Sequence, residues 1–122
     1  MGERRAHAVI DLAALQRNFQ TAHQRSEGRE IIAVIKADAY GHGAVPVAQR
    51  LLQAGCRRLA VVTVDEAVEL REAGVTGEIL VLGGLSAGRD ARLSAEFDLC
   101  PVLHHLRELP LAREAAQSAS RP

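Results

Sequence analysis

The sequence predicts an α/β fold in which parallel strands alternate with helices. Four short segments have strand length and are nearly continuous in apolar residues, and each is followed by a segment with helical spacing. Strands of this kind are buried on both faces, as in a parallel sheet covered by helices. Two architectures fit: an open doubly wound sheet, or part of a (β/α)8 barrel. A whole barrel typically needs about 250 residues, and this chain has 122.

The first elements follow from helical periodicity and from the residues that begin and end helices. Asp11 is expected to cap a helix that ends in the polar stretch 26–28. The run 31–36 is expected to be a strand. The next helix should begin near Pro46, where proline's missing N–H has no consequence, and end at Gly55.

The later elements continue the same alternation. Asp65 is expected to cap the third helix and Gly74 to end it. Pro101 weakens the last strand, and Pro110 delays or kinks the last helix. The expected strands and helices, in chain order, are 59–64, 65–73, 79–82, 89–96, 99–103 and 106–116.

Composition excludes several classes of function. The 15 basic and 15 acidic residues cancel, which argues against a nucleic-acid surface or an anionic membrane partner. The apolar runs are only strand-length, so neither a signal peptide nor a membrane span is expected, and the predicted location is the cytoplasm. Cys56 and Cys100 are isolated and are expected to be reduced, buried thiols. No metal site is expected, since the adjacent His104 and His105 would point to opposite faces of a strand.

Lys36 is the most informative residue, because it is the only lysine in the chain and it closes the strand 31–36. Side chains alternate along a strand, so Ile32, Val34 and Lys36 share one face. In a barrel this face points inward, and Lys36 lies at the carboxyl end, where such barrels carry their chemistry. Lysine is the side chain that forms a Schiff base with an aldehyde cofactor.

The loop after Lys36 adds a second feature. Tyr40 can donate a hydrogen bond to a phosphate oxygen, and Gly41 and Gly43 allow close backbone approach or positive φ. His42 is expected to support this loop through hydrogen bonds. Each feature taken singly has an ordinary explanation: a solvated strand end, a turn, or a packing residue.

Taken together, the segment AVIKADAYGHG, residues 33–43, closely resembles the pyridoxal-phosphate lysine motif of bacterial alanine racemases. Residues 8–19, 59–74 and 78–84 also resemble parts of that family, so the resemblance covers nearly the whole chain. It implies the N-terminal half of a (β/α)8 TIM-type barrel with about four βα units. On this basis residues 1–117 form a partial pyridoxal-phosphate-binding barrel domain, and residues 118–122 a frayed tail.

The resemblance also implies a role for individual residues. Lys36 would bind pyridoxal phosphate as a Schiff base and act as one of two bases on opposite faces of the substrate α-carbon. Tyr40 would bind the cofactor phosphate, and Leu82 would line the cofactor pocket. The family's opposite-face tyrosine and the arginine that binds the pyridine nitrogen lie further along than residue 122.

The implied function is racemisation of L-alanine to D-alanine for cell-wall precursors, by a homodimeric, cytoplasmic, pyridoxal-phosphate-dependent isomerase. The 122 residues alone are expected to be inactive, because they hold one of the two bases. Two alternatives remain: a non-enzymatic pyridoxal-phosphate-binding homeostasis barrel, and a truncated α/β fragment without function. A half barrel would also leave Ile32, Val34, Val61 and Leu82 uncovered, and we expect such a chain to self-associate.

Overall fold

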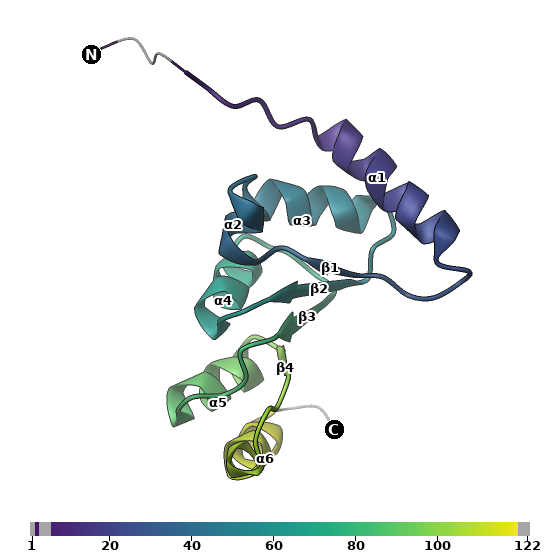
Figure 1. Ribbon diagram of the computed structural model, residues 1–122. Coiled ribbons are helices and arrows are strands. Elements are labelled where there is room, and N and C mark those ends of the chain that lie inside the picture. Colours follow the sequence, from purple (N-terminus) through teal and green to yellow (C-terminus); the bar gives the residue numbers. More distant parts are fainter. Residues whose placement is uncertain (1, 3–5, 120–122) are drawn as a thin grey trace.

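The computed structural model describes residue 2 and residues 6–119 of the chain, which form one parallel sheet and the helices that connect its strands (Figure 1). The α/β prediction is therefore confirmed. The elements in chain order are α1 (Leu12–Arg25), β1 (Ile32–Val34), α2 (Lys36–Tyr40), α3 (Ala44–Gln53), β2 (Arg58–Val61), α4 (Val64–Glu72), β3 (Glu78–Val81), α5 (Gly88–Glu96), β4 (Cys100–Pro101), the 3₁₀ helix η1 (Leu106–Glu108) and α6 (Leu109–Ser118).

The strand order decides between the two predicted architectures. The four strands lie in the order β1-β2-β3-β4, and all three neighbouring pairs are parallel. A doubly wound sheet reverses its strand order at a switch point, whereas a barrel adds each new strand beside the previous one. The observed sheet is singly wound, as in a (β/α)8 barrel.

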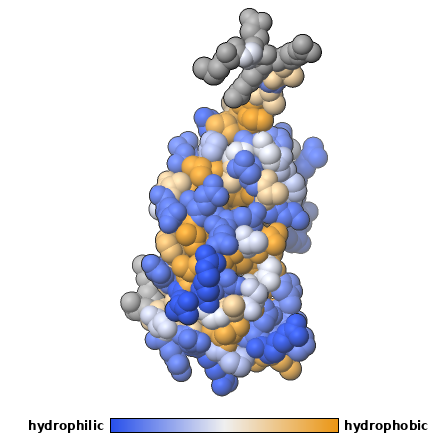
Figure 2. Space-filling model, turned by 90° about the vertical axis from the view of Figure 1, so that its left-hand side faces the viewer, coloured by the Kyte–Doolittle hydropathy of each residue, from blue (hydrophilic) through white to orange (hydrophobic). Residues whose placement is uncertain are grey.

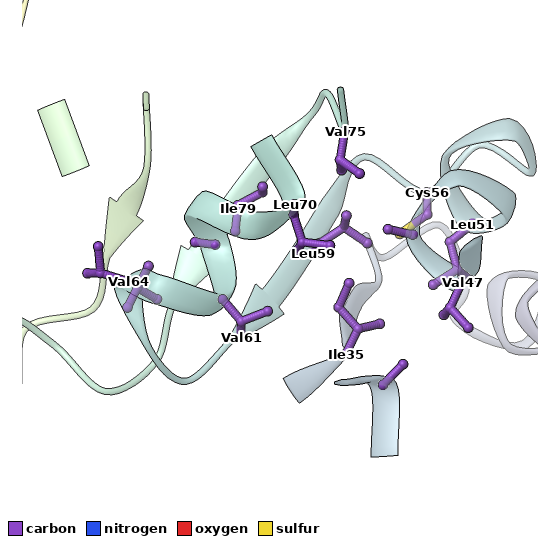
Figure 3. Packing of buried hydrophobic residues seen from close by; sticks show 14 residues of the cluster. Ile35, Val47, Leu51, Cys56, Leu59, Val61, Val64, Leu70, Val75 and Ile79 are labelled. Atoms are coloured by element: carbon purple, nitrogen blue, oxygen red, sulfur yellow. The ribbon is translucent and has the colours of Figure 1, made fainter. Parts of the chain in front are cut away.

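One face of the sheet forms the hydrophobic core with the connecting helices. Leu59, Val61, Ile79 and Val81 are fully buried on this face, and Leu70 of α4 packs against them. Figure 3 shows Leu59, Leu70 and Ile79 beside one another in this cluster. Burying side chains of this size stabilises a fold by about 1.5–3 kcal/mol each.

The other face of the sheet is open. Ile32 and Val34 of β1 remain 43% and 40% exposed, as the half-barrel interpretation predicted, and Leu82 is half-buried. The prediction for Val61 was wrong, because this residue is 1% exposed. Val61 pairs with Val81 on the helix-facing side, and its neighbour Val62 is the one left exposed, at 36%.

We expect this open face to make the chain self-associate. Ile32, Val34 and Val62 are 43%, 40% and 36% exposed, and contiguous exposed apolar side chains favour association between copies of a chain. The double substitution Ile32→Thr/Val62→Thr should lower the weight-average mass measured by light scattering at micromolar concentration. Val9→Thr is the matched control, since Val9 is 82% exposed and lies in the extended segment before α1 (Figure 1). A wild-type chain that stays monomeric and unfolds in one cooperative transition would contradict the expectation.

The helix caps differ from the prediction at one place. Asp11 caps α1 as expected, accepting a hydrogen bond from the Ala14 amide at 2.9 Å. The cap of α4 is Thr63 and not Asp65, since the Thr63 hydroxyl accepts from the Glu66 amide and the Glu66 carboxylate accepts from the Thr63 amide. This reciprocal pair satisfies two amides at the start of the helix, as in a capping box.

The C-terminal elements are shorter or later than expected. The strand predicted at 99–103 is reduced to Cys100–Pro101, although the Val102 amide still donates to Val81 O at 2.9 Å. N–H groups point alternately to the two sides of a strand, and the Val102 amide points toward β3. The N–H that Pro101 lacks would therefore point away from β3, where the described part of the chain has no strand to pair with, so no ladder bond is lost. Pro110 lies in the first turn of α6, where it is tolerated. The last helix reaches Ser118, and residues 120–122 of the predicted tail lie outside the described residues.

The two cysteines are free, but only one is buried. Cys56 is 4% exposed, and burial raises the pKa of its thiol. Cys100 was predicted to be buried and is exposed, because it lies on the short edge strand β4, where no further strand covers it.

Candidate functional site

Lys36 begins an unusual left-handed turn that directly follows the sheet. The strand predicted over 31–36 ends at Val34, and Ala37, Asp38, Ala39 and Tyr40 have φ values between 50° and 55°. L-residues disfavour this conformation by roughly 1–2 kcal/mol each. Strained backbone persists where the surrounding structure holds it, and it concentrates at functional sites.

Hydrogen bonds within the loop hold the far end of this turn. Asp38 Oδ1 accepts from the Ala44 amide at 2.8 Å, which joins the turn to the first residue of α3. The Ala39 amide donates to Ile35 O at 3.0 Å. His42 Nδ1 lies 2.9 Å from Ala39 O, so His42 supports the loop as predicted. Gly41 and Gly43, with φ of 85° and 92°, let the chain return to α3.

The near end of the turn is held by Glu66, a residue of α4. Glu66 Oε1 accepts from the Ala37 amide at 2.7 Å, and Oε2 accepts from the amides of Val62 and Thr63. Burial alone would raise the pKa of Glu66, but the bonds from Thr63, Ala37 and Val62 outweigh it and hold the pKa below its ordinary value. Glu66 therefore remains a carboxylate at neutral pH.

The turn brings together the two residues that the lysine motif pointed to. Lys36 is half-buried, and its Nζ lies 5.9 Å from the centre of the Tyr40 ring, whose side chain is largely exposed. Within residues 6–119, no carboxylate lies at ion-pair distance from this amine. An amine held beside a phenol and not engaged in an ion pair fits what an aldehyde cofactor with a phosphate group requires.

Leu82, the third predicted site residue, lies at the same edge of the sheet but two strands away. It directly follows β3, and its amide donates to Val61 O at 2.8 Å. Its carbonyl oxygen contacts His104 Nε2.

The surface on the side where α2, α4 and α5 lie in Figure 1 carries both hydrophobic and hydrophilic residues (Figure 2).

A second carboxylate joins the loops that follow β3 and β4. Glu108 is 8% exposed and accepts from the amides of Leu85, His104 and His105 at 2.6–2.9 Å. These bonds hold the pKa of Glu108 below its ordinary value. His104 and His105 lie beyond β4, outside the predicted strand 99–103, and His105 caps η1.

Neither glutamate was predicted to hold the site, although a signal for Glu66 was present. Thr63-Val64-Asp65-Glu66 is a T-x-x-E capping box placed directly after a strand. The bond from the Ala37 amide to the other oxygen of Glu66 could not be predicted in this way, because it joins loops that lie 29 residues apart in sequence. Among the described residues, no group of three or more His, Cys, Asp or Glu side chains is placed to hold a metal ion.

A parallel sheet with each strand beside the previous one, and with its candidate lysine at the carboxyl edge, has the strand order of a (β/α)8 barrel. The profile of one protein family, described as the N-terminal domain of alanine racemase, matches residues 10–122. The chain belongs to this family.

Curated relatives agree with the family assignment. The chain is 47% identical over 104 residues to an alanine racemase of Synechocystis sp., which covers 84% of this chain and 28% of the relative. It is 45% identical over 112 residues to an alanine racemase of Pseudomonas syringae pv. syringae, covering 92% and 31%. The chain thus spans less than a third of the length of these relatives.

Solved structures show the same relation. Alanine racemase from Bacillus anthracis with bound L-Ala-P superimposes with a TM-score of 0.79 at 40% identity, covering 91% of this chain and 29% of that one. The enzyme from D-cycloserine-producing Streptomyces lavendulae superimposes with a TM-score of 0.82 at 36% identity, covering 92% of this chain and 29% of that one.

Within the described residues, no helix has the length and hydropathy needed to cross a membrane.

Proposed function

We propose that this chain carries the cofactor-binding part of a pyridoxal-phosphate-dependent racemase that converts L-alanine to D-alanine. The observation that carries the proposal is the half-buried amine of Lys36 beside Tyr40, on a turn held at the carboxyl edge of a barrel-type sheet. The full reaction belongs to a homodimeric cytoplasmic enzyme that supplies D-alanine for cell-wall precursors.

Each residue has a chemical task in this proposal. Pyridoxal phosphate, when bound, supplies an electron sink that makes the α-proton of an amino acid removable. Lys36 would hold the cofactor at its aldehyde carbon through Nζ and, once the substrate's amino group has replaced it there, its free amine would take or return a proton on one face of the α-carbon. The Tyr40 hydroxyl would donate a hydrogen bond to the phosphate, and Leu82 would line the cofactor pocket.

Two alternative functions make different predictions. A non-enzymatic barrel protein for pyridoxal-phosphate homeostasis would bind the cofactor and support no racemisation in any context. A truncated fragment without function would not bind the cofactor at all. The relatives named above are alanine racemases, which favours the enzyme.

The cofactor proposal is tested by reductive labelling. Because Lys36 is the only lysine, borohydride reduction in the presence of pyridoxal phosphate should give one pyridoxyl-lysine peptide, and Lys36→Arg should abolish it. Tyr40→Phe removes one hydrogen bond to a charged group, and we expect about tenfold or greater loss of apparent affinity. Labelling confined to the N-terminal amine in the wild type would refute the proposal.

Racemisation is tested separately. The 122 residues contain the Lys36 base and not the base for the opposite face, so we expect no turnover of L-alanine by the chain alone. A protein in which the chain is continued by the remainder of a relative should racemise alanine, and its Lys36→Arg variant should not. Cofactor binding without turnover in the continued protein would favour the homeostasis alternative.

A further inference from the structure

We propose that Glu66 is a positioning residue for Lys36, because its carboxylate fastens the left-handed turn to the carboxyl end of the neighbouring strand β2. The consequence for cofactor binding rests on the proposed function, whereas the contact between Glu66 and the turn does not.

The two oxygens of Glu66 divide their hydrogen bonds between two loops. Oε1 accepts from the Ala37 amide at 2.7 Å, one residue after Lys36. Oε2 accepts from the amides of Val62 and Thr63 at 2.8 and 2.9 Å, directly after β2. A single carboxylate therefore joins the ends of two adjacent strands at the edge where Lys36 lies.

The turn requires such an anchor at its beginning. Ala37 has φ of 50° and ψ of 52°, and no glycine lies between Lys36 and Tyr40 to adopt this region freely. Asp38 and Gly41 hold the end of the turn through bonds to Ala44 and within the loop. Glu66 holds the beginning, next to Lys36 itself.

The anchor is itself rigid. Glu66 lies in the first turn of α4, where its amide donates to Thr63 Oγ1, and α4 is fixed to the core by Val64, Ala67 and Leu70, all at most 4% exposed. A side chain supported in this way holds the turn at a fixed position relative to the sheet. A carboxylate also suits the task, because it accepts several charge-assisted hydrogen bonds at once.

Glu66→Gln is the sharpest test, because glutamine has nearly the same shape and only one acceptor oxygen. We expect hydrogen exchange at the Ala37 amide, read residue by residue by mass spectrometry, to become at least about tenfold faster. The apparent affinity for pyridoxal phosphate, measured by borohydride labelling of Lys36, should weaken about tenfold. Glu69→Gln, an exposed glutamate on the same helix, should change neither.

Two further variants separate positioning from general destabilisation. Thr63→Ala removes the hydroxyl cap that supports Glu66 but keeps the carboxylate that binds the Ala37 amide, so exchange at Ala37 should quicken clearly less than in Glu66→Gln. Adding Ala37→Gly to Glu66→Gln supplies a residue that adopts positive φ without steric cost, so labelling of Lys36 should be partly restored, including when Glu66→Gln alone folds poorly.

Three outcomes would overturn the positioning role. They are unchanged exchange at Ala37 in Glu66→Gln, equal loss in Thr63→Ala, and failure of Ala37→Gly to restore labelling. A wild-type chain that binds no pyridoxal phosphate would refute the proposed function instead, and exchange at Ala37 would still decide whether Glu66 holds the turn.

Discussion

Replacing Arg71 by alanine is expected to lower the free energy of unfolding by about 3 kcal/mol. Arg71 lies in the last turn of α4, and its guanidinium donates to four backbone carbonyls on two loops at the amino edge of the sheet. The acceptors are Phe97 O at 2.8 Å and Val75, Gly77 and Asp98 O at 2.9 Å. Burial lowers the pKa of Arg71 while the Asp98 carboxylate opposes that shift, and the group stays charged throughout the usual pH range.

Urea unfolding of the less associating Ile32→Thr/Val62→Thr background would measure this effect. Arg71→Lys keeps the charge but loses the planar fork, so it should recover only part of the stability. Arg89→Ala is the control, since the exposed Arg89 pairs with Asp65 at the surface, where solvent screens the two charges and such pairs contribute little to stability. Equal losses in Arg71→Ala and Arg89→Ala would show that the four carbonyl bonds contribute little.

The fold was predictable because it depends on patterns that are local in sequence. Apolar strands that alternate with helices fixed the fold class and the parallel sheet. The choice between the two architectures needed the strand order, which only the family resemblance anticipated. The prediction that Val61 would lie on the open face was wrong. A run without polar residues does not alternate in hydrophobicity, so the sequence does not show which residues face the helices.

The site was predictable in its residues and not in its backbone. Lys36 and Tyr40 are identified by a motif, but alanine and tyrosine do not by themselves indicate left-handed conformation. This conformation is imposed by Glu66 and Asp38, which bind amides 29 and 6 residues away in sequence. The glycines at 41 and 43 were the one local sign of positive φ in this loop.

Glu66 and Glu108 have the same structural role, because each binds loops that follow neighbouring strands. Each is a glutamate near the start of a helix, and each carboxylate binds three backbone amides from loops at the carboxyl edge. Amides beyond the ends of the strands have fewer ladder partners, and here the two carboxylates accept hydrogen bonds from six of them. We infer that these carboxylates hold the loops in place at this edge.

Glu108→Gln should therefore weaken the fold in a pH-dependent way. The amides of Leu85, His104 and His105 lower the folded pKa of Glu108. Its stabilising effect is thus fully present above the unfolded carboxyl pKa of about 4.3 and is lost as the pH falls through the lower folded value. The variant should be less stable at pH 7 and show a smaller further loss between about pH 5 and pH 3. Glu114→Gln, on the exposed side of α6, should retain the wild-type pH profile.

Gly84→Ala tests whether the Glu108 carboxylate holds the loop after β3. Gly84 has φ of 76°, and a Cβ built there would overlap Glu108 Oε1. The substitution should destabilise by about 2 kcal/mol or more, since it adds left-handed strain and displaces the carboxylate. If Glu108 is the reason, adding Gly84→Ala to Glu108→Gln should cause a loss smaller than the sum of the two single losses. Additive losses would mean that strain at residue 84 acts alone and that Glu108 does not hold this loop.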